Sequence, residues 1–300
     1  MYVILGATGN TGSVATEALL AKKQPVRVVG RNKEHLARFA ARGAETFVAD
    51  VTDSAALAKA FTGARAVYAM VPPNITAPDP RAYQTQVTNS IANALESAKV
   101  THLVCLSSIG ADKPDKCGPV TGLHELEQRF KQIARLNALY LRAGYFMENI
   151  LPQVALIKNL GKMVGPIRAD LPLPMIATQD IGIAAADALQ KLDFTGHQAH
   201  ESLGQRDLTY SDVSKIIGAA ISKPDLTYVQ IPAEQAIEGM SQMGMSRNFA
   251  TLLIEMCDSL NNGYMKAMEP RSAKNTTSTS YEEFVRRVFL PAYKGQAAKA

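Results

Sequence analysis

Three evenly spaced glycines follow the first apolar run of the chain. Gly6, Gly9 and Gly12 form a GxxGxxG pattern directly after Tyr-Val-Ile-Leu at positions 2–5. Glycines at this spacing permit a tight turn, let the backbone approach a pyrophosphate, and direct the amides of a helix N-terminus toward negative charge. Between a strand and a helix, the pattern predicts a dinucleotide site rather than an ordinary turn. The residues expected to contact the pyrophosphate are Gly6, Ala7, Thr8, Gly9, Asn10, Thr11 and Gly12.

A basic residue stands where the second nucleotide contact is expected. NAD-specific domains place Asp or Glu about 20 residues beyond the loop, on the ribose 2′-hydroxyl. This chain has Gly30-Arg31-Asn32 there and no acid. A carboxylate would repel a 2′-phosphate, whereas a guanidinium binds it through two parallel hydrogen bonds. We therefore predict NADP(H) rather than NAD(H), with Arg31 and secondarily Lys33 at the phosphate. The alternative is that both side chains are only solvated.

Two further groups of residues end the third and fourth apolar runs. Ligands of parallel sheets lie at the carboxyl ends of the strands, so residues at these positions are candidates for the cofactor. Asp50 can accept a hydrogen bond from the adenine amine, beside Val51; alternatively, Asp50 caps the following helix. Backbone contacts are expected from Met70, Val71 and Pro72.

Short apolar runs and helical stretches alternate through the first half of the chain. Strands are predicted at residues 2–5, 25–29, 44–48, 66–70, 102–106 and 138–141, and helices at 12–22, 34–42, 54–61, 82–97 and 121–134. Continuous apolar strands separated by helices are typical of a doubly wound parallel sheet. The chain is therefore predicted to have an α/β fold, with an NADP-binding Rossmann domain over residues 1–150.

The pattern changes after residue 142. Prolines at 166–174 predict a loop, and His197 and His200 are also placed in a loop. Helices are predicted at 180–192, 211–222, 233–244, 249–262 and 281–289, with one short strand at 225–231. We predict a smaller, mainly helical C-terminal substrate lobe over residues 151–300, some of whose elements return to the Rossmann sheet.

Composition excludes several classes of protein. Hydrophobic residues make up 47% of the chain and charged residues 20%, so the bulk of the chain is not disordered. No apolar run reaches the ~20 residues of a membrane helix. The net charge of +5 is scattered and the chain has no tryptophan, which argues against a nucleic-acid partner. Three cysteines without CxxC spacing favour a cytoplasmic location and no metal site.

Several segments together resemble the NmrA-like branch of the atypical short-chain dehydrogenase/reductases. They are the glycine loop at 6–12, Gly-Arg-Asn at 30–32, Ala-Asp-Val-Thr-Asp at 49–53, Ser-Ser-Ile-Gly-Ala-Asp at 107–112 and the stretch 141–149. The resemblance implies an NADP-binding Rossmann domain with a small substrate lobe. It places Tyr145, Phe146 and Asn149 at the nicotinamide. One departure is Ala143, where many relatives have proline. Some relatives, such as quinone reductases and a triphenylmethane-dye reductase, are enzymes, whereas others bind the dinucleotide as regulators.

The chain lacks the acid that ordinary members of that superfamily use. None of its ten tyrosines has a lysine four residues later. Ser107 does occupy the serine position expected beside the cofactor. The corresponding helix carries His124, whose neighbours Glu127, Gln128 and Lys131 are expected to form a polar face toward the cleft. His124 is the candidate catalytic residue, as proton donor, and water is the other source of the proton. The alternative is a surface histidine on an amphipathic helix.

The missing acid bears on the substrate. Reducing a ketone produces an alkoxide whose conjugate acid has a pKa of about 16, whereas that of a hydroquinone is about 10. The gap corresponds to about 8 kcal/mol of product stabilisation. We therefore predict an NADPH-dependent reductase of quinone-like or other conjugated acceptors. The alternative is a non-catalytic NADP(H)-sensing regulator; a sugar-nucleotide epimerase is disfavoured because it also needs the tyrosine. A homo-oligomer and a regulatory protein partner are left open.

Overall fold

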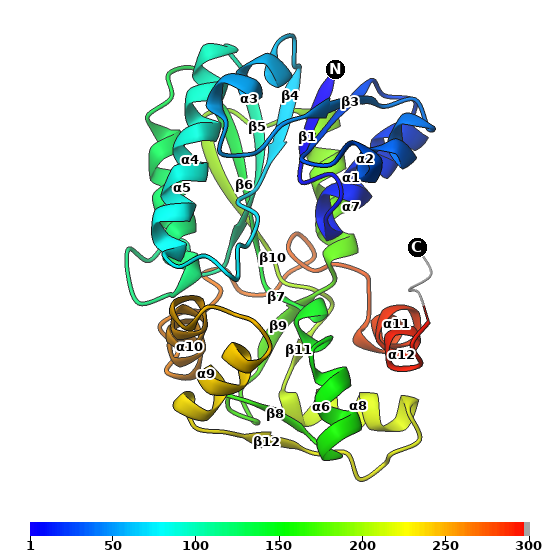
Figure 1. Cartoon of the computed structure of the whole chain (residues 1–300). Coiled ribbons are helices and arrows are strands. Elements are labelled where there is room, and N and C mark those ends of the chain that lie inside the picture. The colour runs from blue at the N-terminus through cyan, green and yellow to red at the C-terminus, as the bar shows by residue number, and fades with distance from the viewer. Residues whose placement is uncertain (297–300) are drawn as a thin grey trace.

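Seven parallel strands form the central sheet of the protein, in a computed structural model that describes residues 1–296 (Figure 1). The order across the sheet is β10-β6-β5-β4-β1-β2-β3, and every neighbouring pair is parallel. The strands are β1 (Tyr2–Leu5), β2 (Val26–Gly30), β3 (Glu45–Val48), β4 (Ala66–Ala69), β5 (His102–Ser108), β6 (Asn137–Ala143) and β10 (His197–Ser202).

Helices cover both faces of this sheet. Side chains alternate between the faces along a strand, so Tyr2 and Ile4 of β1 belong to one core, and Val3 and Leu5 belong to the other. The first core includes α1 (Asn10–Ala21), α2 (Lys33–Ala40) and α7 (Thr178–Lys191); the second includes α3 (Ser54–Phe61), α4 (Pro80–Ser97) and α5 (Pro119–Lys131). Burial on both faces explains the continuous apolar runs, and the predicted doubly wound fold is confirmed.

Two elements from beyond residue 150 complete the Rossmann unit. Helix α7 packs along α1, and β10 pairs in parallel with β6 at the edge of the sheet. His197 and His200 therefore lie on a strand, and their predicted placement in a loop is wrong. The sequence of β10 is His-Gln-Ala-His-Glu-Ser, which lacks the apolar run of the inner strands because its first residues are largely exposed at the sheet edge.

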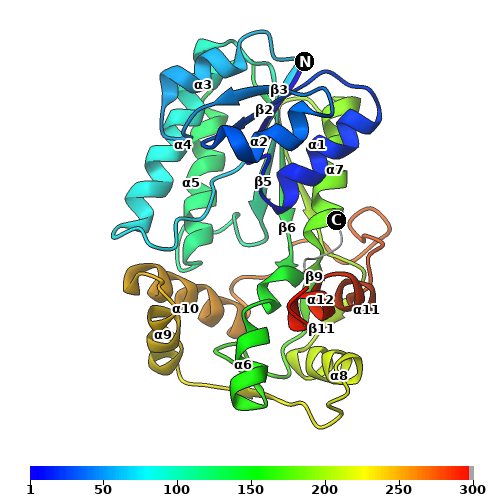
Figure 2. The same cartoon turned by 45° about the vertical axis from the view of Figure 1, so that its right-hand side comes forward.

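The remaining elements form the second lobe, which lies beyond the carboxyl ends of the sheet strands (Figures 1 and 2). Its strands are β7 (Tyr145–Phe146), β8 (Met163–Gly165), β9 (Leu173–Ile176), β11 (Asp207–Leu208) and β12 (Tyr228–Gln230). Its helices are η1 (Met147–Ile150), α6 (Gln153–Leu160), α8 (Tyr210–Ala220), α9 (Ala233–Gln242), α10 (Arg247–Asn261), α11 (Tyr281–Phe284), the π-helical η2 (Val285–Phe289) and α12 (Leu290–Tyr293). The loop predicted at 166–174 instead leads into β9.

Residues 297–300, which end the predicted substrate lobe, lie outside the described residues. Within residues 1–296, no helix combines the length and apolar character needed to cross a membrane. In the same range, no three or more His, Cys, Asp or Glu side chains gather in a way that would hold a metal ion.

Candidate dinucleotide and acceptor site

The glycine loop makes its turn at the carboxyl end of β1. Gly6 has a φ of +62°, and the Gly9 amide donates to the Gly6 carbonyl at 2.9 Å. A Cβ on Gly12 would lie 2.3 Å from the same carbonyl oxygen, so no side chain fits there. The loop is therefore held close to the first turn of α1, as a turn that cradles a phosphate requires.

The N-terminus of α1 is left open. Gly9 is the N-cap residue, no side chain caps the helix, and the first turn contains no acidic residue. The free amides and the helix dipole at such an end favour an anion. Thr8, Gly9 and Asn10 are exposed, whereas the Thr11 hydroxyl is buried and accepts a hydrogen bond from Tyr68 at 2.8 Å. Among these residues, Thr11 is thus available to a ligand through its backbone only.

Arg31 and Asp50 lie at the ends of β2 and β3. Arg31 is exposed, as is Lys33, the first residue of α2. The Asp50 carboxylate accepts hydrogen bonds from the Thr52 hydroxyl at 2.7 Å and the Thr52 amide at 2.9 Å. These bonds, together with the charge of Arg31, hold the pKa of Asp50 below its usual value. Asp53, not Asp50, caps α3, so the helix-cap alternative for Asp50 is wrong.

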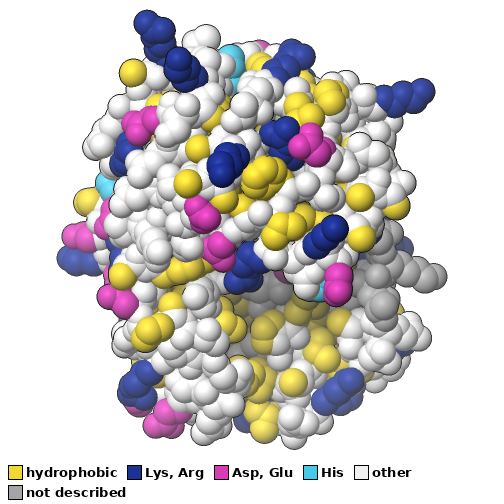
Figure 3. Space-filling model, turned by 45° about the horizontal axis from the view of Figure 1, so that its top comes forward, with side chains coloured by type: hydrophobic (Ala, Val, Ile, Leu, Met, Phe, Trp, Pro, Cys, Tyr) yellow, Lys and Arg dark blue, Asp and Glu magenta, His cyan; other side chains and the backbone are white. Residues whose placement is uncertain are grey.

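A cavity of about 280 Å³ opens where β4, β5 and β6 end, and we call it the acceptor cavity. Helix α10 closes its other side with Phe249, Leu253, Met256 and Leu260. The predicted cofactor residues that line it are Met70, Val71, Pro72, Ser107, Tyr145, Phe146 and Asn149. Met70 also packs against Gly6 of the glycine loop. Figure 3 shows a recess between the two parts of the molecule, with hydrophobic side chains on its floor.

Polar side chains around the acceptor cavity are largely turned into the protein. The Ser107 hydroxyl donates to Glu127 at 2.7 Å, and the Ser108 hydroxyl donates to the Ile109 carbonyl at 2.9 Å. The Tyr145 hydroxyl lies 3.0 Å from that of Tyr210, and burial raises the pKa of Tyr145. The cavity therefore offers a bound ring mainly apolar surface, and these hydroxyl groups are already hydrogen-bonded within the protein.

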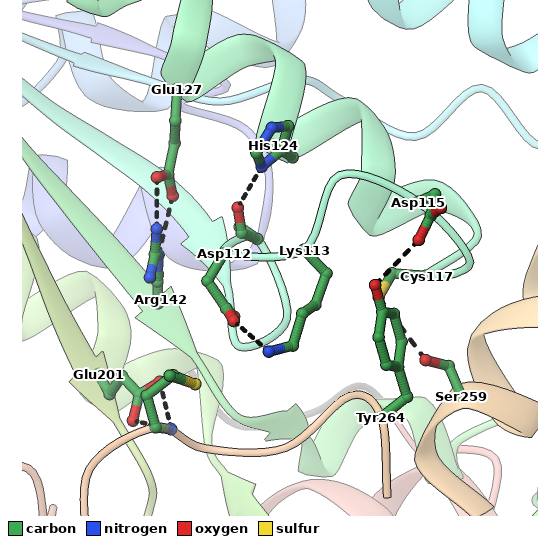
Figure 4. A network of polar contacts seen from close by, with 12 residues as sticks. Asp112, Lys113, Asp115, Cys117, His124, Glu127, Arg142, Glu201, Ser259 and Tyr264 are labelled. Atoms are coloured by element: carbon green, nitrogen blue, oxygen red, sulfur yellow. Dashed lines mark hydrogen bonds and ion pairs between the residues drawn. The ribbon is translucent and has the colours of Figure 1, made fainter. Parts of the chain in front are cut away.

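His124 lies beside the acceptor cavity but is not one of its lining residues. Its Nδ1 atom is 2.9 Å from the Ala111 carbonyl, so the ring connects α5 to the loop that follows β5 (Figure 4). Leu123, one residue earlier, does line the cavity. The predicted polar face around His124 is wrong in part, because Glu127 is 1% exposed and lies between α5 and the sheet, where it contacts Ser107 of β5 and Arg142 of β6.

Comparison with known proteins identifies the family. The sequence pattern of the NmrA-like family matches residues 2–285. The chain belongs to the NmrA-like family. The predicted family is thereby confirmed. An NAD(P)H azoreductase from Xenophilus azovorans is 29% identical over 260 residues, which cover 85% of this chain and 86% of that protein.

Two solved structures share the fold. An NADPH-dependent quinone oxidoreductase from Escherichia coli, complexed with NADPH, is 21% identical, with a TM-score of 0.82 over 96% of this chain and 100% of that one. The triphenylmethane reductase of a Citrobacter species, complexed with NADP(H), is 18% identical, with a TM-score of 0.79 over 95% and 99% of the two chains.

The stretch 141–149 of this NmrA-like protein contributes two partly buried charged side chains, Arg142 and Glu148. Arg142 donates to Glu127 through Nε at 3.0 Å and Nη2 at 2.7 Å (Figure 4). Glu148 accepts from the Thr178 amide at 3.0 Å and the Thr178 hydroxyl at 2.6 Å, and burial raises the pKa of Glu148. These contacts fix β6 to α5 and η1 to the start of α7, and thereby frame the acceptor cavity. Glu127 is the member of these pairs that the sequence pattern misassigned.

Proposed function

We propose that this protein is an NADPH-dependent reductase whose acceptor is a quinone or another conjugated, electron-poor ring compound. The observation that carries the proposal is the juxtaposition of an open anion-binding loop with an apolar cavity. The cavity lies at the carboxyl ends of the strands, where ligands of doubly wound sheets bind. Three of the hydroxyl groups that line it, those of Ser107, Ser108 and Tyr145, are hydrogen-bonded within the protein.

The residues present fit a dinucleotide phosphate. A side chain at Gly12 would collide with the Gly6 carbonyl, and one at Gly6 would be strained by its φ of +62°. The amides of the first turn of α1 have no capping side chain, so a pyrophosphate fits there. Arg31 is exposed at the end of β2 for a 2′-phosphate. Tyr145 and Phe146 line the cavity and would border the nicotinamide end of the cofactor. NADPH, when bound, supplies a hydride.

The protein contributes orientation of the reactants and exclusion of water rather than a strong acid. Aligning a flat acceptor against the cofactor and excluding water removes much of the entropic barrier to the reaction. A hydroquinone oxyanion is only weakly basic, so it takes its proton from water without help from a side chain. A simple ketone would need about 8 kcal/mol more stabilisation of its product oxyanion. The hydroxyls of Ser107, Ser108 and Tyr145 do not offer it, because they are bonded within the protein.

A panel of acceptors tests the proposal. NADPH oxidation is followed with a naphthoquinone, an azo dye, a triphenylmethane dye and cyclohexanone. We expect turnover with one or more of the conjugated acceptors and none with cyclohexanone. Tight NADPH binding without oxidation by any acceptor would contradict the reductase and favour an NADP(H)-sensing regulator. Turnover of cyclohexanone would contradict the argument from product basicity.

The cofactor preference is tested at Arg31. An arginine–phosphate contact contributes about 1.5–3 kcal/mol, so Arg31→Ala should weaken NADPH binding roughly ten- to a hundredfold and NADH binding little. Calorimetric titration of both cofactors measures this, with Arg42→Ala as the control because Arg42 is an exposed arginine paired with Glu17. Equal affinity of the wild type for NADPH and NADH would refute the assignment.

A further inference from the structure

A second cavity lies directly behind the acceptor cavity. This rear cavity has a volume of about 300 Å³ and lies between the start of β9, the loop after α10 and Leu203. Three residues line both cavities: Ile109, Leu260 and Met265. These three side chains therefore form the wall that separates the two cavities.

Of the three wall side chains, that of Met265 is the most able to change its shape. Leu260 is in helix α10, and Ile109 is tied to the end of β6 by its amide, which donates to the Ala143 carbonyl at 3.0 Å. Met265 lies in the loop after α10 and is 5% exposed. Methionine is unbranched and has three rotatable side-chain bonds, so it adapts its shape without backbone movement.

The backbone around Met265 is held on both sides. Its amide donates to the Ser259 carbonyl at 2.9 Å, and the Tyr264 hydroxyl donates to Asp115 at 2.9 Å. Downstream, the Met268 amide donates to the buried Glu201 at 2.9 Å (Figure 4). Changes at Met265 are therefore confined to the side chain itself.

Gly110 shows how closely this side chain approaches the site. Gly110 has a φ of +86°, and a Cβ there would lie 2.6 Å from the Met265 Cγ atom. The loop after β5 thus makes room for the methionine, which lies against the acceptor cavity as an end wall.

We infer that Met265 is a specificity-determining residue that limits the length of the acceptor, and that the rear cavity is a subsite for an apolar chain. The inference rests on the proposed function. The lining of the rear cavity includes Leu171, Pro172, Leu173, Pro174 and Leu203, which suit an alkyl or prenyl substituent. The lining also holds four charged residues: Arg271 binds Asp207 and two backbone carbonyls, and Asp207, Lys266 and Glu269 are exposed to solvent. In the wild type, Met265 restricts the acceptor cavity to compact rings. Replacing Met265 with a shorter side chain joins the two cavities.

A series of 2-alkyl-1,4-benzoquinones from methyl to hexyl tests this inference. In the wild type, kcat/KM should not rise with chain length. In Met265→Ala it should rise about fourfold for each methylene that enters the rear cavity, so the hexyl-to-methyl ratio should increase at least tenfold. Met268→Ala is the matched control, since Met268 is a methionine of the same loop that is 56% exposed and lines neither cavity.

A second substitution tests whether the alkyl substituent of the quinone enters the rear cavity. Leu171 lines the rear cavity only. Leu171→Phe, added to Met265→Ala, should return the chain-length ratio toward the wild-type value. Met265→Val, with a smaller but still apolar side chain, replaces the alanine variant if that one does not fold, as judged by thermal unfolding and NADPH binding.

The outcomes separate this inference from the proposed function. If compact quinones are reduced but Met265→Ala and Met268→Ala show the same chain-length ratio as the wild type, the inference is wrong and the reductase stands. If the wild type reduces no quinone, the proposed acceptor class fails. In that case calorimetric binding of the same alkyl series to the NADPH complex still decides whether Met265 limits chain length.

Discussion

The buried ion pair behind the acceptor cavity makes a quantitative prediction. Glu127 is 1% exposed and accepts hydrogen bonds from Ser107 and from two nitrogens of Arg142. Burial opposes the charge of Arg142, but the hydrogen bonds and the negative charge of Glu127 outweigh it and keep the pKa of Arg142 above its ordinary value. Glu127→Gln removes that charge and places an amide donor against a guanidinium donor, or turns it toward Ser107.

Breaking one side of a buried pair costs about 3–5 kcal/mol, because the remaining charge is left uncompensated. The Arg142 side chain retains 15% exposure, so partial hydration favours the lower end, about 3 kcal/mol. Unfolding entropy is about 2.1 cal/mol/K per residue, or roughly 0.6 kcal/mol/K for this chain. The expected fall in Tm is therefore about 5 °C.

Thermal unfolding of matched variants provides the assay. Glu96 pairs with Arg129 in a more exposed setting, with side-chain exposures of 43% and 23%, and Glu96→Gln should cost no more than about 1 kcal/mol. The double variant Glu127→Leu, Arg142→Met should recover much of the loss, because it leaves no uncompensated charge. A fall in Tm for Glu127→Gln no larger than that for Glu96→Gln would refute the reasoning.

Three further predictions concern the loop, the histidine and a buried acid. Gly9→Val should fold, since a Cβ there meets only the Gly6 carbonyl at 3.3 Å. Calorimetry should nevertheless show that its affinity for NADPH is lowered more than about tenfold. Gly239→Val is the control, because Gly239 on α9 faces open space. His124→Ala should lower kcat less than about tenfold, and a thousandfold loss would make it the proton donor. Burial raises the pKa of Glu148, so the folded state binds the carboxyl proton more tightly than the unfolded state does, and the stability of the wild type falls as pH rises through the raised pKa. The Tm of Glu148→Gln should therefore increase relative to that of the wild type from pH 5 to pH 7. The same Tm difference at both pH values would contradict this.

The dinucleotide loop could be read from the sequence because its constraint is local. A side chain at position 12 would collide with the carbonyl of residue 6, and both lie within one strand–loop–helix unit. The core strands were predicted for a similar reason: burial on both faces leaves continuous apolar runs. At the edge of the sheet a strand is not buried on both faces. Strand β10, which contains two histidines and a glutamine, therefore lacks the apolar run that would have predicted it.

The acceptor cavity could be predicted only in part, because its far wall comes from distant segments. Met70 was predicted from its position after an apolar run, whereas Ser107 and Tyr145 were predicted from the resemblance to the NmrA-like family. Nothing in the local pattern of α10 or of the loop holding Met265 indicates that they lie opposite those strands. Glu127 was misassigned because a carboxylate on an amphipathic helix is usually exposed. The partner that allows its burial, Arg142, lies on a separate element, strand β6.

The two halves of the site recognise their ligands by different physics. In the proposed reductase, backbone amides and a helix dipole at the glycine loop would bind charge, so recognition would depend on an unobstructed backbone and on Arg31 for the additional phosphate. At the acceptor cavity, the hydroxyls of Ser107, Ser108 and Tyr145 are directed into the protein, so recognition depends on shape and apolar contact. Hydrogen bonds to an acceptor discriminate strongly between chemical groups, whereas apolar pockets discriminate mainly by size. A site built in this way accepts chemically different rings of similar dimensions, and the side chain that sets those dimensions becomes the main determinant of specificity.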